Sequence, residues 1–115
     1  MYKRAYQDTF SENPNLARET EKKAFDIALG LLRECETSQR NSMKKVEALH
    51  FLERLWSTLL EDLAHPDNEL GDDLKARIIS IGIWVIKESV AIRVNQTTSL
   101  KNLIEINEIV RSGLD

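Results

Sequence analysis

His50 has the arrangement closest to a metal site in this sequence. Glu47 and Glu53 lie three residues before and three residues after it, and on a helix this spacing puts the three side chains on one face. Such a face offers an imidazole and two carboxylates to a divalent metal ion. Three ligands from one helix cannot complete a tetrahedral site alone, and this spacing is common on solvated helix faces. We therefore predict no metal site.

The remaining carboxylates have no catalytic spacing. Asp67, Asp72 and Asp73 do not match an EF-hand loop, and helix capping is the role that their positions predict. Glu61 and Asp62 are adjacent on a helix and point apart, which suits paired acid–base chemistry poorly. The sequence also has no Gly-rich phosphate loop and no recognisable Ser or Cys nucleophile paired with a His. We predict that the protein is not an enzyme and needs no cofactor.

Cysteine content and charge limit the partners. Cys35 is the single cysteine, which excludes an internal disulfide and fits a reducing cytoplasm. It falls late in a helical pattern, so we expect it to be a small buried hydrophobe. The net charge is −3, and the doublets Lys22-Lys23 and Lys44-Lys45 have acidic neighbours. Direct nucleic-acid binding is therefore disfavoured, because such binders concentrate a basic excess on one face.

Chain length predicts one domain, residues 1–115, with one hydrophobic core. The N-terminus lacks the apolar segment of a secretory signal. The longest apolar run, Ile78–Ile86, is far shorter than the ~20 residues that a membrane span needs. We expect a soluble cytoplasmic protein without membrane insertion.

Two helical segments are predicted in the first half of the chain. The first starts at Asn13-Pro14, where Asn can cap the helix and Pro occupies the first helical position, and it extends to about Glu36. The second runs from about Ser42 to Ala64 and ends at His65-Pro66, because Pro disfavours helical geometry in the preceding residue. Its apolar stripe consists of Leu49, Leu52, Trp56, Leu59 and Leu63.

A third helix is predicted from about Asp72 to Asn95. Three-and-four spacing sustained over its length favours a helix over a β-strand, and apolar residues on two adjoining faces predict a central position. Gly82 inside this helix costs about 1 kcal/mol relative to Ala, so we expect another helix to approach closely there. The two stripes consist of Leu74, Ile78, Ile81, Val85 and Ile92, and of Ile79, Ile83, Ile86, Val90 and Val94.

The fold class predicted from these segments is all-α. A short last helix follows the capping residues 97–99 and stops at Gly113, and short polar loops join the four helices. This organisation predicts a small antiparallel bundle of about four helices. Residues 1–12 form an N-terminal arm that is unusually aromatic. The sequence leaves open whether this arm is a short helix laid over the bundle or a segment that orders only on a partner.

The two tryptophans are the strongest candidates for contact with a partner. The apolar stripe around Trp56 favours a core role for it, whereas Trp84 falls outside both stripes of its helix and fits either role. A groove between the second and third helices would accept the apolar face of an amphipathic partner helix. The candidate partner-binding residues are Tyr6, Phe10, Trp56, Leu59, Leu63, Ile81 and Trp84, and the turn and packing motif comprises Pro66, Asp67, Asn68, Leu70 and Gly82.

A set of motifs spread over nearly the whole chain resembles a known family. The motifs are Tyr6-Gln7, Leu55-Trp56, Asp62-Leu63-Ala64, Pro66-Asp67-Asn68, Leu70, Leu74, Ile78–Gly82, Ile106-Asn107 and Gly113-Leu114. Their order and spacing resemble the FlaF family of flagellar biosynthesis regulators from alphaproteobacteria. One departure is Gly71, which stands where the family pattern has Pro.

The resemblance implies a role in flagellin production and export. FlaF-like proteins act with, and in opposition to, a companion regulator called FlbT, which restrains translation of flagellin mRNA. The resemblance implies a cytoplasmic secretion chaperone that binds flagellin and covers its apolar helical face. The alternative is a regulatory adaptor that binds FlbT and relieves its hold on translation. A homodimer is left open, because the doubly apolar third helix could be shared between two chains.

Overall fold

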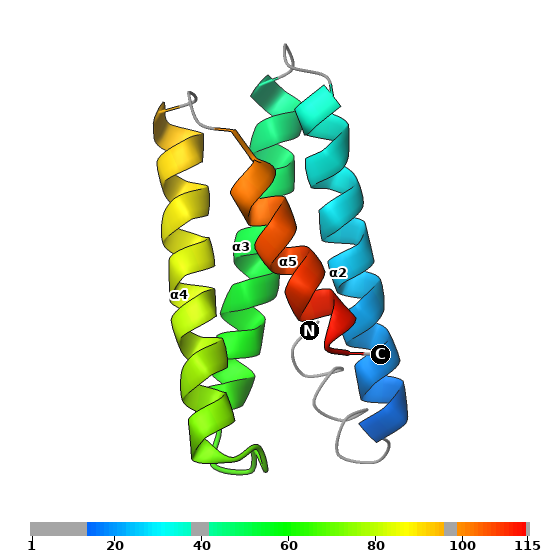
Figure 1. Ribbon diagram of the computed structural model, residues 1–115, viewed down its shortest axis with the longest axis vertical. Helices are drawn as coiled ribbons and strands as arrows, with labels where there is room; N and C mark the ends of the chain where they lie inside the picture. The colour runs from blue at the N-terminus through cyan, green and yellow to red at the C-terminus, as the bar shows by residue number, and fades with distance from the viewer. Residues whose placement is uncertain (1–13, 38–41, 96–98, 115) are drawn as a thin grey trace.

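The structure is a computed structural model that describes residues 14–37, 42–95 and 99–114. These residues form four α-helices and no β-strand, which confirms the predicted all-α class (Figure 1). The predicted bounds of the second and third helices are confirmed, and the first and last helices differ from their predicted bounds by a residue or two. The helices are α2 (Pro14–Thr37), α3 (Ser42–Ala64), α4 (Asp72–Asn95) and α5 (Lys101–Ser112).

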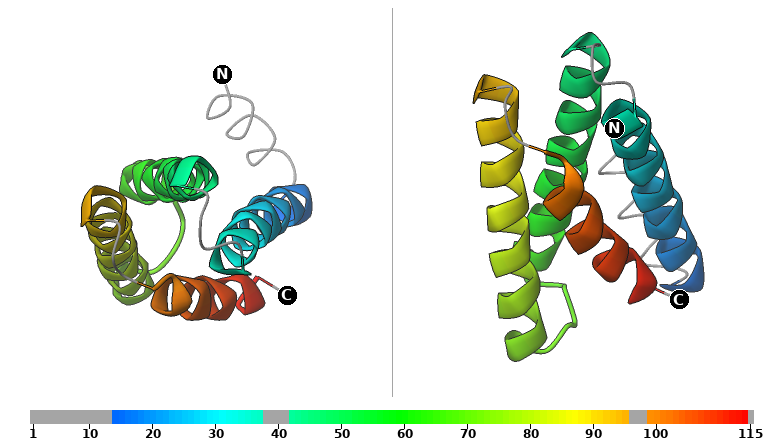
Figure 2. Two further views of the ribbon diagram at one scale, coloured as in Figure 1. Left: turned by 90° about the horizontal axis from the view of Figure 1, so that it is seen from above. Right: turned by 45° about the horizontal axis from the view of Figure 1, so that its top comes forward.

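The four helices stand in a ring, in the order α2, α3, α4, α5 (Figure 2). Each helix runs opposite to the one before it, and the short α5 crosses the bundle at a tilt (Figure 1). Among the described residues, α3 and α4 share the most extensive contact, followed by α2 with α3 and α2 with α5, whereas α4 and α5 touch only slightly. The predicted antiparallel bundle is therefore confirmed, with its loosest seam between α4 and α5.

Trp56 of α3 is at the centre of the core and has no exposed surface. Its ring meets the ring of Phe25 from α2 edge to face, with 5.8 Å between the centroids and 83° between the planes. This is one of the arrangements that aromatic pairs prefer. The other large side chains that are fully buried are Leu32, Leu49, Leu52, Val85, Ile92, Leu100 and Leu103, with the polar Ser89 and Asn107.

Gly82 is where α4 comes closest to α3. A Cβ atom built on Gly82 would lie 2.8 Å from Cε3 of Trp56 and 2.9 Å from Cδ2 of Leu60. Real Cβ atoms essentially never show contacts that short. The predicted close approach of a second helix at this glycine is confirmed, and the contact offsets the low helix propensity of glycine.

The predicted turn at Pro66 is confirmed. Here α3 ends at Ala64, Asn68 Oδ1 accepts a hydrogen bond from the backbone N–H of Leu70 at 3.0 Å, and the Gly71 carbonyl accepts from the N–H of Lys75 at 2.9 Å. Asn side chains commonly close turns in this way. Asp72 and Asp73 occupy the first turn of α4, where negative charge is favourable.

The prediction that the third helix is central is wrong. Of its two apolar stripes, the first is mostly buried or half-buried, but the second leaves Ile83 and Val94 exposed, at 45% and 68%. The physical reason lies in the number of helices. In a ring of four, every helix keeps an outward face, and the described residues supply no further element to cover that of α4 (Figure 2).

Candidate protein-binding surfaces

The three side chains of the candidate metal site do not act together. Glu53 faces α4, where its Oε2 atom accepts hydrogen bonds from Ser89 Oγ at 2.8 Å and from Arg93 Nε at 3.2 Å. His50 and Glu47 are exposed to solvent. Within the residues that the structure describes, no group of three His, Cys, Asp or Glu side chains could hold a metal ion. The carboxylate of Glu53 thus serves the contact between helices.

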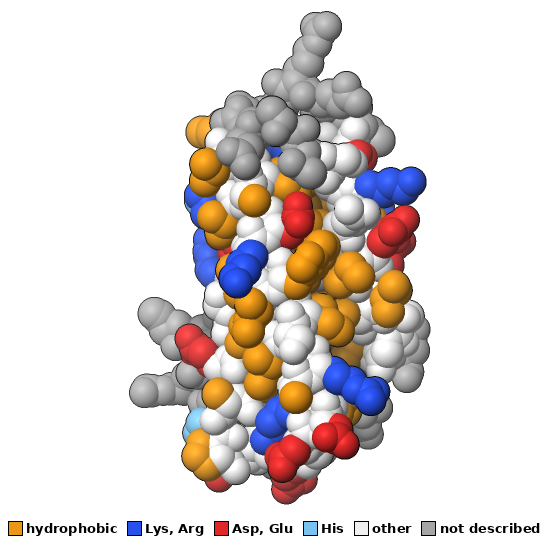
Figure 3. Space-filling view, turned by 60° about the vertical axis from the view of Figure 1, so that its left-hand side comes forward, with side chains coloured by type: hydrophobic (Ala, Val, Ile, Leu, Met, Phe, Trp, Pro, Cys, Tyr) orange, Lys and Arg blue, Asp and Glu red, His pale blue; other side chains and the backbone are white. Residues whose placement is uncertain are grey.

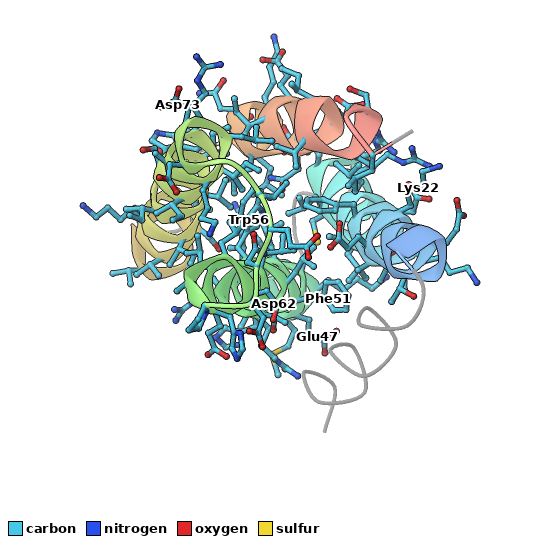
Figure 4. The ribbon with its side chains drawn as sticks, turned by 90° about the horizontal axis from the view of Figure 1, so that it is seen from below. Lys22, Glu47, Phe51, Trp56, Asp62 and Asp73 are labelled. Atoms are coloured by element: carbon cyan, nitrogen blue, oxygen red, sulfur yellow. The ribbon has the colours of Figure 1, made fainter. Side chains whose placement is uncertain are left out.

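The other reactive side chains are also dispersed. Asp62 lies on α3 and Asp73 lies at the start of the neighbouring helix α4, and the two carboxylates lie apart (Figure 4). Cys35 is buried, as predicted. Its burial, and secondarily the charge of Glu34, raise the pKa of its thiol, which disfavours the reactive thiolate.

Two of the candidate partner-binding residues, Trp56 and Leu63, are buried in the core. The indole N–H of Trp56 donates a hydrogen bond to Asn107 Oδ1 at 2.7 Å, and Asn107 Nδ2 donates to the carbonyl of Leu103 at 2.7 Å. Contact with a partner through Trp56 or Leu63 would require the bundle to open. The core role favoured for Trp56 is confirmed.

Asn107 was named in the sequence only as part of the motif Ile106-Asn107, and its structural role was missed. Its side chain has no exposed surface. The available signal was its position, four residues after Leu103 and three before Val110, which puts an amide on the apolar stripe of α5. A buried amide needs hydrogen-bond partners, and the indole of Trp56 is one of the few donors that a helical core contains.

The other candidate contact residues differ in how much surface they offer. Leu59 and Ile81 are half-buried and pack against the core. Trp84 is 38% exposed, and it follows Gly82 by two residues, about 200° around the helix axis. Because Gly82 faces α3, Trp84 points away from α3. Tyr6 and Phe10 lie outside the described residues.

Trp84 belongs to an apolar surface along the outward side of α4. We call this set of exposed side chains the α4 outer surface. Figure 3 shows hydrophobic side chains in a broken band along this side of the molecule, with charged side chains between and beside them. Large contiguous apolar patches on a protein surface often mark interaction sites. The α4 outer surface comprises Ile83, Trp84 and Val94.

A second apolar site is a groove between α2 and α3, with a volume of about 460 Å³. Phe51 lies between these two helices (Figure 4). The sequence predicts a groove between α3 and α4, and this prediction is wrong. At Gly82 these two helices approach closely, and the side chains of Trp56 and Leu60 fill the space between them. The α2–α3 groove is lined by Thr20, Lys23, Ala24, Ile27, Phe51, Arg54, Leu55 and Thr58.

Fold and surfaces together define a small all-α bundle whose candidate sites are apolar surfaces. None of its described helices is long and apolar enough to cross a membrane. The sequence profile described as "Flagellar protein FlaF" matches residues 2–114, nearly the whole chain. The chain therefore belongs to the FlaF family of flagellar proteins, which confirms the resemblance seen in its motifs. No match was found among curated proteins or among solved structures.

Proposed function

We propose that this FlaF-family protein promotes flagellin synthesis and export by binding flagellin in the cytoplasm, as a secretion chaperone. The observation that carries the proposal is the α4 outer surface on a member of a flagellar family. An export substrate must stay soluble before it is secreted. Covering the apolar face of one of its helices would achieve this without nucleotide or metal.

The α4 outer surface fits an amphipathic helix in length and chemistry. Its members extend from Ile83 to Val94, and eleven residues of helix, about three turns, measure about 17 Å. Trp84 is its largest side chain, and Trp residues commonly carry much of the binding energy of an interface. The exposed Arg77 and Lys87 lie on either side of Trp84 along the helix, so acidic groups on the partner helix would be favoured.

The first test is a Trp84→Ala variant. We expect its affinity for flagellin in titration calorimetry to fall by about tenfold or more, because Trp is a typical hot-spot residue of interfaces. Its thermal melt, followed by circular dichroism, should change little because Trp84 is not in the core. The matched control is Met43→Ala, which removes another exposed apolar side chain, at 71%, from the N-terminal end of α3 and should bind like the wild type.

Two results would contradict the proposal. Unchanged flagellin affinity in Trp84→Ala would remove the α4 outer surface as the docking site. Co-purification with FlbT and not with flagellin would instead support the regulatory adaptor. A stable complex with flagellin that forms without FlbT supports the chaperone.

A further inference from the structure

Helix α2 stands opposite α4 in the ring (Figure 2). The groove between α2 and α3 therefore lies away from the α4 outer surface, and the proposed function leaves it unused. Ala24 and Leu55 form part of its buried floor, whereas Ile27 is 53% exposed at its edge. We propose that the groove is a docking site for the N-terminal segment of the same chain, residues 2–10. The occupant is identified by its side-chain spacing, its reach and its chemistry.

The aromatic side chains of the segment have the spacing of one face of a helix, and such a face suits a long apolar groove. Tyr2, Tyr6 and Phe10 are four residues apart, and this spacing aligns side chains on one side of a helix, about 6 Å apart along its axis. Ala5 adds a small apolar side chain next to this row. The match to the FlaF family begins at residue 2, so the segment is part of the family domain.

The groove lies within reach of the segment. Helix α2 starts at Pro14, and Thr20, the first groove residue, is six residues further on, about 9 Å along the helix. A segment that folds back at Pro14 would run antiparallel to α2. If the docked segment is a helix, it advances by the same rise per residue as α2. Phe10 would then lie near Thr20, and Tyr2 would lie near Ile27 at the far end of the groove.

The chemistry of the groove favours aromatic side chains with polar tips. Lys23 and Arg54 are exposed at its rim above the apolar lining. Cations held over aromatic rings are attracted by the ring quadrupole. Tyr also presents an apolar body to the groove and a hydroxyl to solvent. Phe51, on the α3 side of the groove, provides a further ring for stacking.

Covalent attachment favours this occupant over any separate molecule. A segment joined to the groove by a short linker experiences an effective concentration in the millimolar range. A free partner must compete with that concentration. The same argument predicts that docking occurs within one chain, and not between two copies.

The test is disulfide trapping in the full-length protein with Cys35→Ala. One variant carries Lys3→Cys and Glu47→Cys; Glu47 is exposed one helical turn before Phe51, at the far end of the groove. The control variant carries Lys3→Cys and Ala91→Cys. Ser89 Oγ lies 3.3 Å from the carbonyl oxygen of Leu49, so Ala91 lies at the height of Glu47 but on α4. Its side chain is exposed there.

We expect an intrachain disulfide between positions 3 and 47 to form about tenfold faster or more than the control pair, because docking concentrates the two thiols. Tyr6→Ala should lower the rate toward that of the control, and Tyr6→Phe should retain it. Equal rates for the two pairs would overturn the proposal. So would disulfides that form only between chains, because they would assign the groove to a second copy. Flagellin is absent from this assay, so its outcome is independent of the proposed function.

Discussion

The hydrogen bond between Trp56 and Asn107 joins helices that are far apart in the sequence. Trp56 comes from α3 and Asn107 from α5, and both side chains lack exposed surface. A buried indole N–H without a partner would lose the free energy of its hydration, and so would a buried amide oxygen. The bond therefore fixes which side of α5 faces the core, in addition to the apolar contacts of Leu100 and Leu103.

A double-mutant cycle tests this pair. Asn107→Leu and Trp56→Phe should each lower the free energy of unfolding by about 1–3 kcal/mol, because each leaves one buried polar group unsatisfied. The double variant should be more stable than the sum of the two effects predicts, by about 1 kcal/mol, because neither orphan group remains. Urea unfolding measures all four proteins. The control is Asn102→Leu, at an exposed position of α5, and its free energy of unfolding should change little. Strict additivity in the cycle would contradict the coupling.

Two glycines within helices have opposite surroundings. Gly82 in α4 lies against Trp56 and Leu60, whereas nothing lies within 4 Å of a Cβ built on Gly30 in α2. Helix propensity alone treats the two positions alike. The structure therefore separates a glycine that a helix contact requires from one that merely lowers the stability of its helix.

Alanine substitutions at these glycines should change stability in opposite directions. Gly30→Ala should raise the free energy of unfolding by about 0.5–1 kcal/mol through helix propensity. Gly82→Ala should lower it by about 1–3 kcal/mol, because the added methyl group overpacks a rigid, buried indole. Thermal and urea unfolding of the two variants measure the difference. A Gly82→Ala protein as stable as Gly30→Ala would show that α3 and α4 are not in close contact there.

Helix limits could be predicted because their signals are local. Pro66 disfavours helical geometry in His65, next to the end of α3 at Ala64, and the acidic residues Asp72 and Asp73 mark the start of α4. The placement of the groove could not be predicted. Helical spacing tells which side chains share a face, but which faces meet depends on how all the helices pack. For the same reason, the two apolar stripes of α4 predict a central helix, although Ile83 and Val94 of one stripe are exposed.

At the scale of the whole molecule, the bundle is a ring with unequal seams. The seam between α3 and α4 is the most extensive, and the one between α4 and α5 is the slightest. Helix α5 is held mainly by α2. Arg33 Nη2 lies 2.6 Å from Glu108 Oε2, and Glu36 Oε2 accepts a hydrogen bond from the Leu100 N–H at 3.1 Å. Exposed ion pairs contribute only about 0.2–1 kcal/mol each, so α5 depends on its few buried side chains.

Unequal seams predict the order in which the bundle opens. Helix α5 has only 12 residues, and isolated helices shorter than about 12–15 residues are marginal in water. Once detached from α2, it should therefore unfold. In native-state hydrogen exchange, we expect the amides of α5 around Asn107 to open with a lower free energy and a weaker denaturant dependence than those of α3 around Trp56. The amides of α5 and α3 could instead share one opening free energy and one denaturant dependence. In that case the bundle opens only as a whole, and the slight contact between α4 and α5 has no consequence for its dynamics.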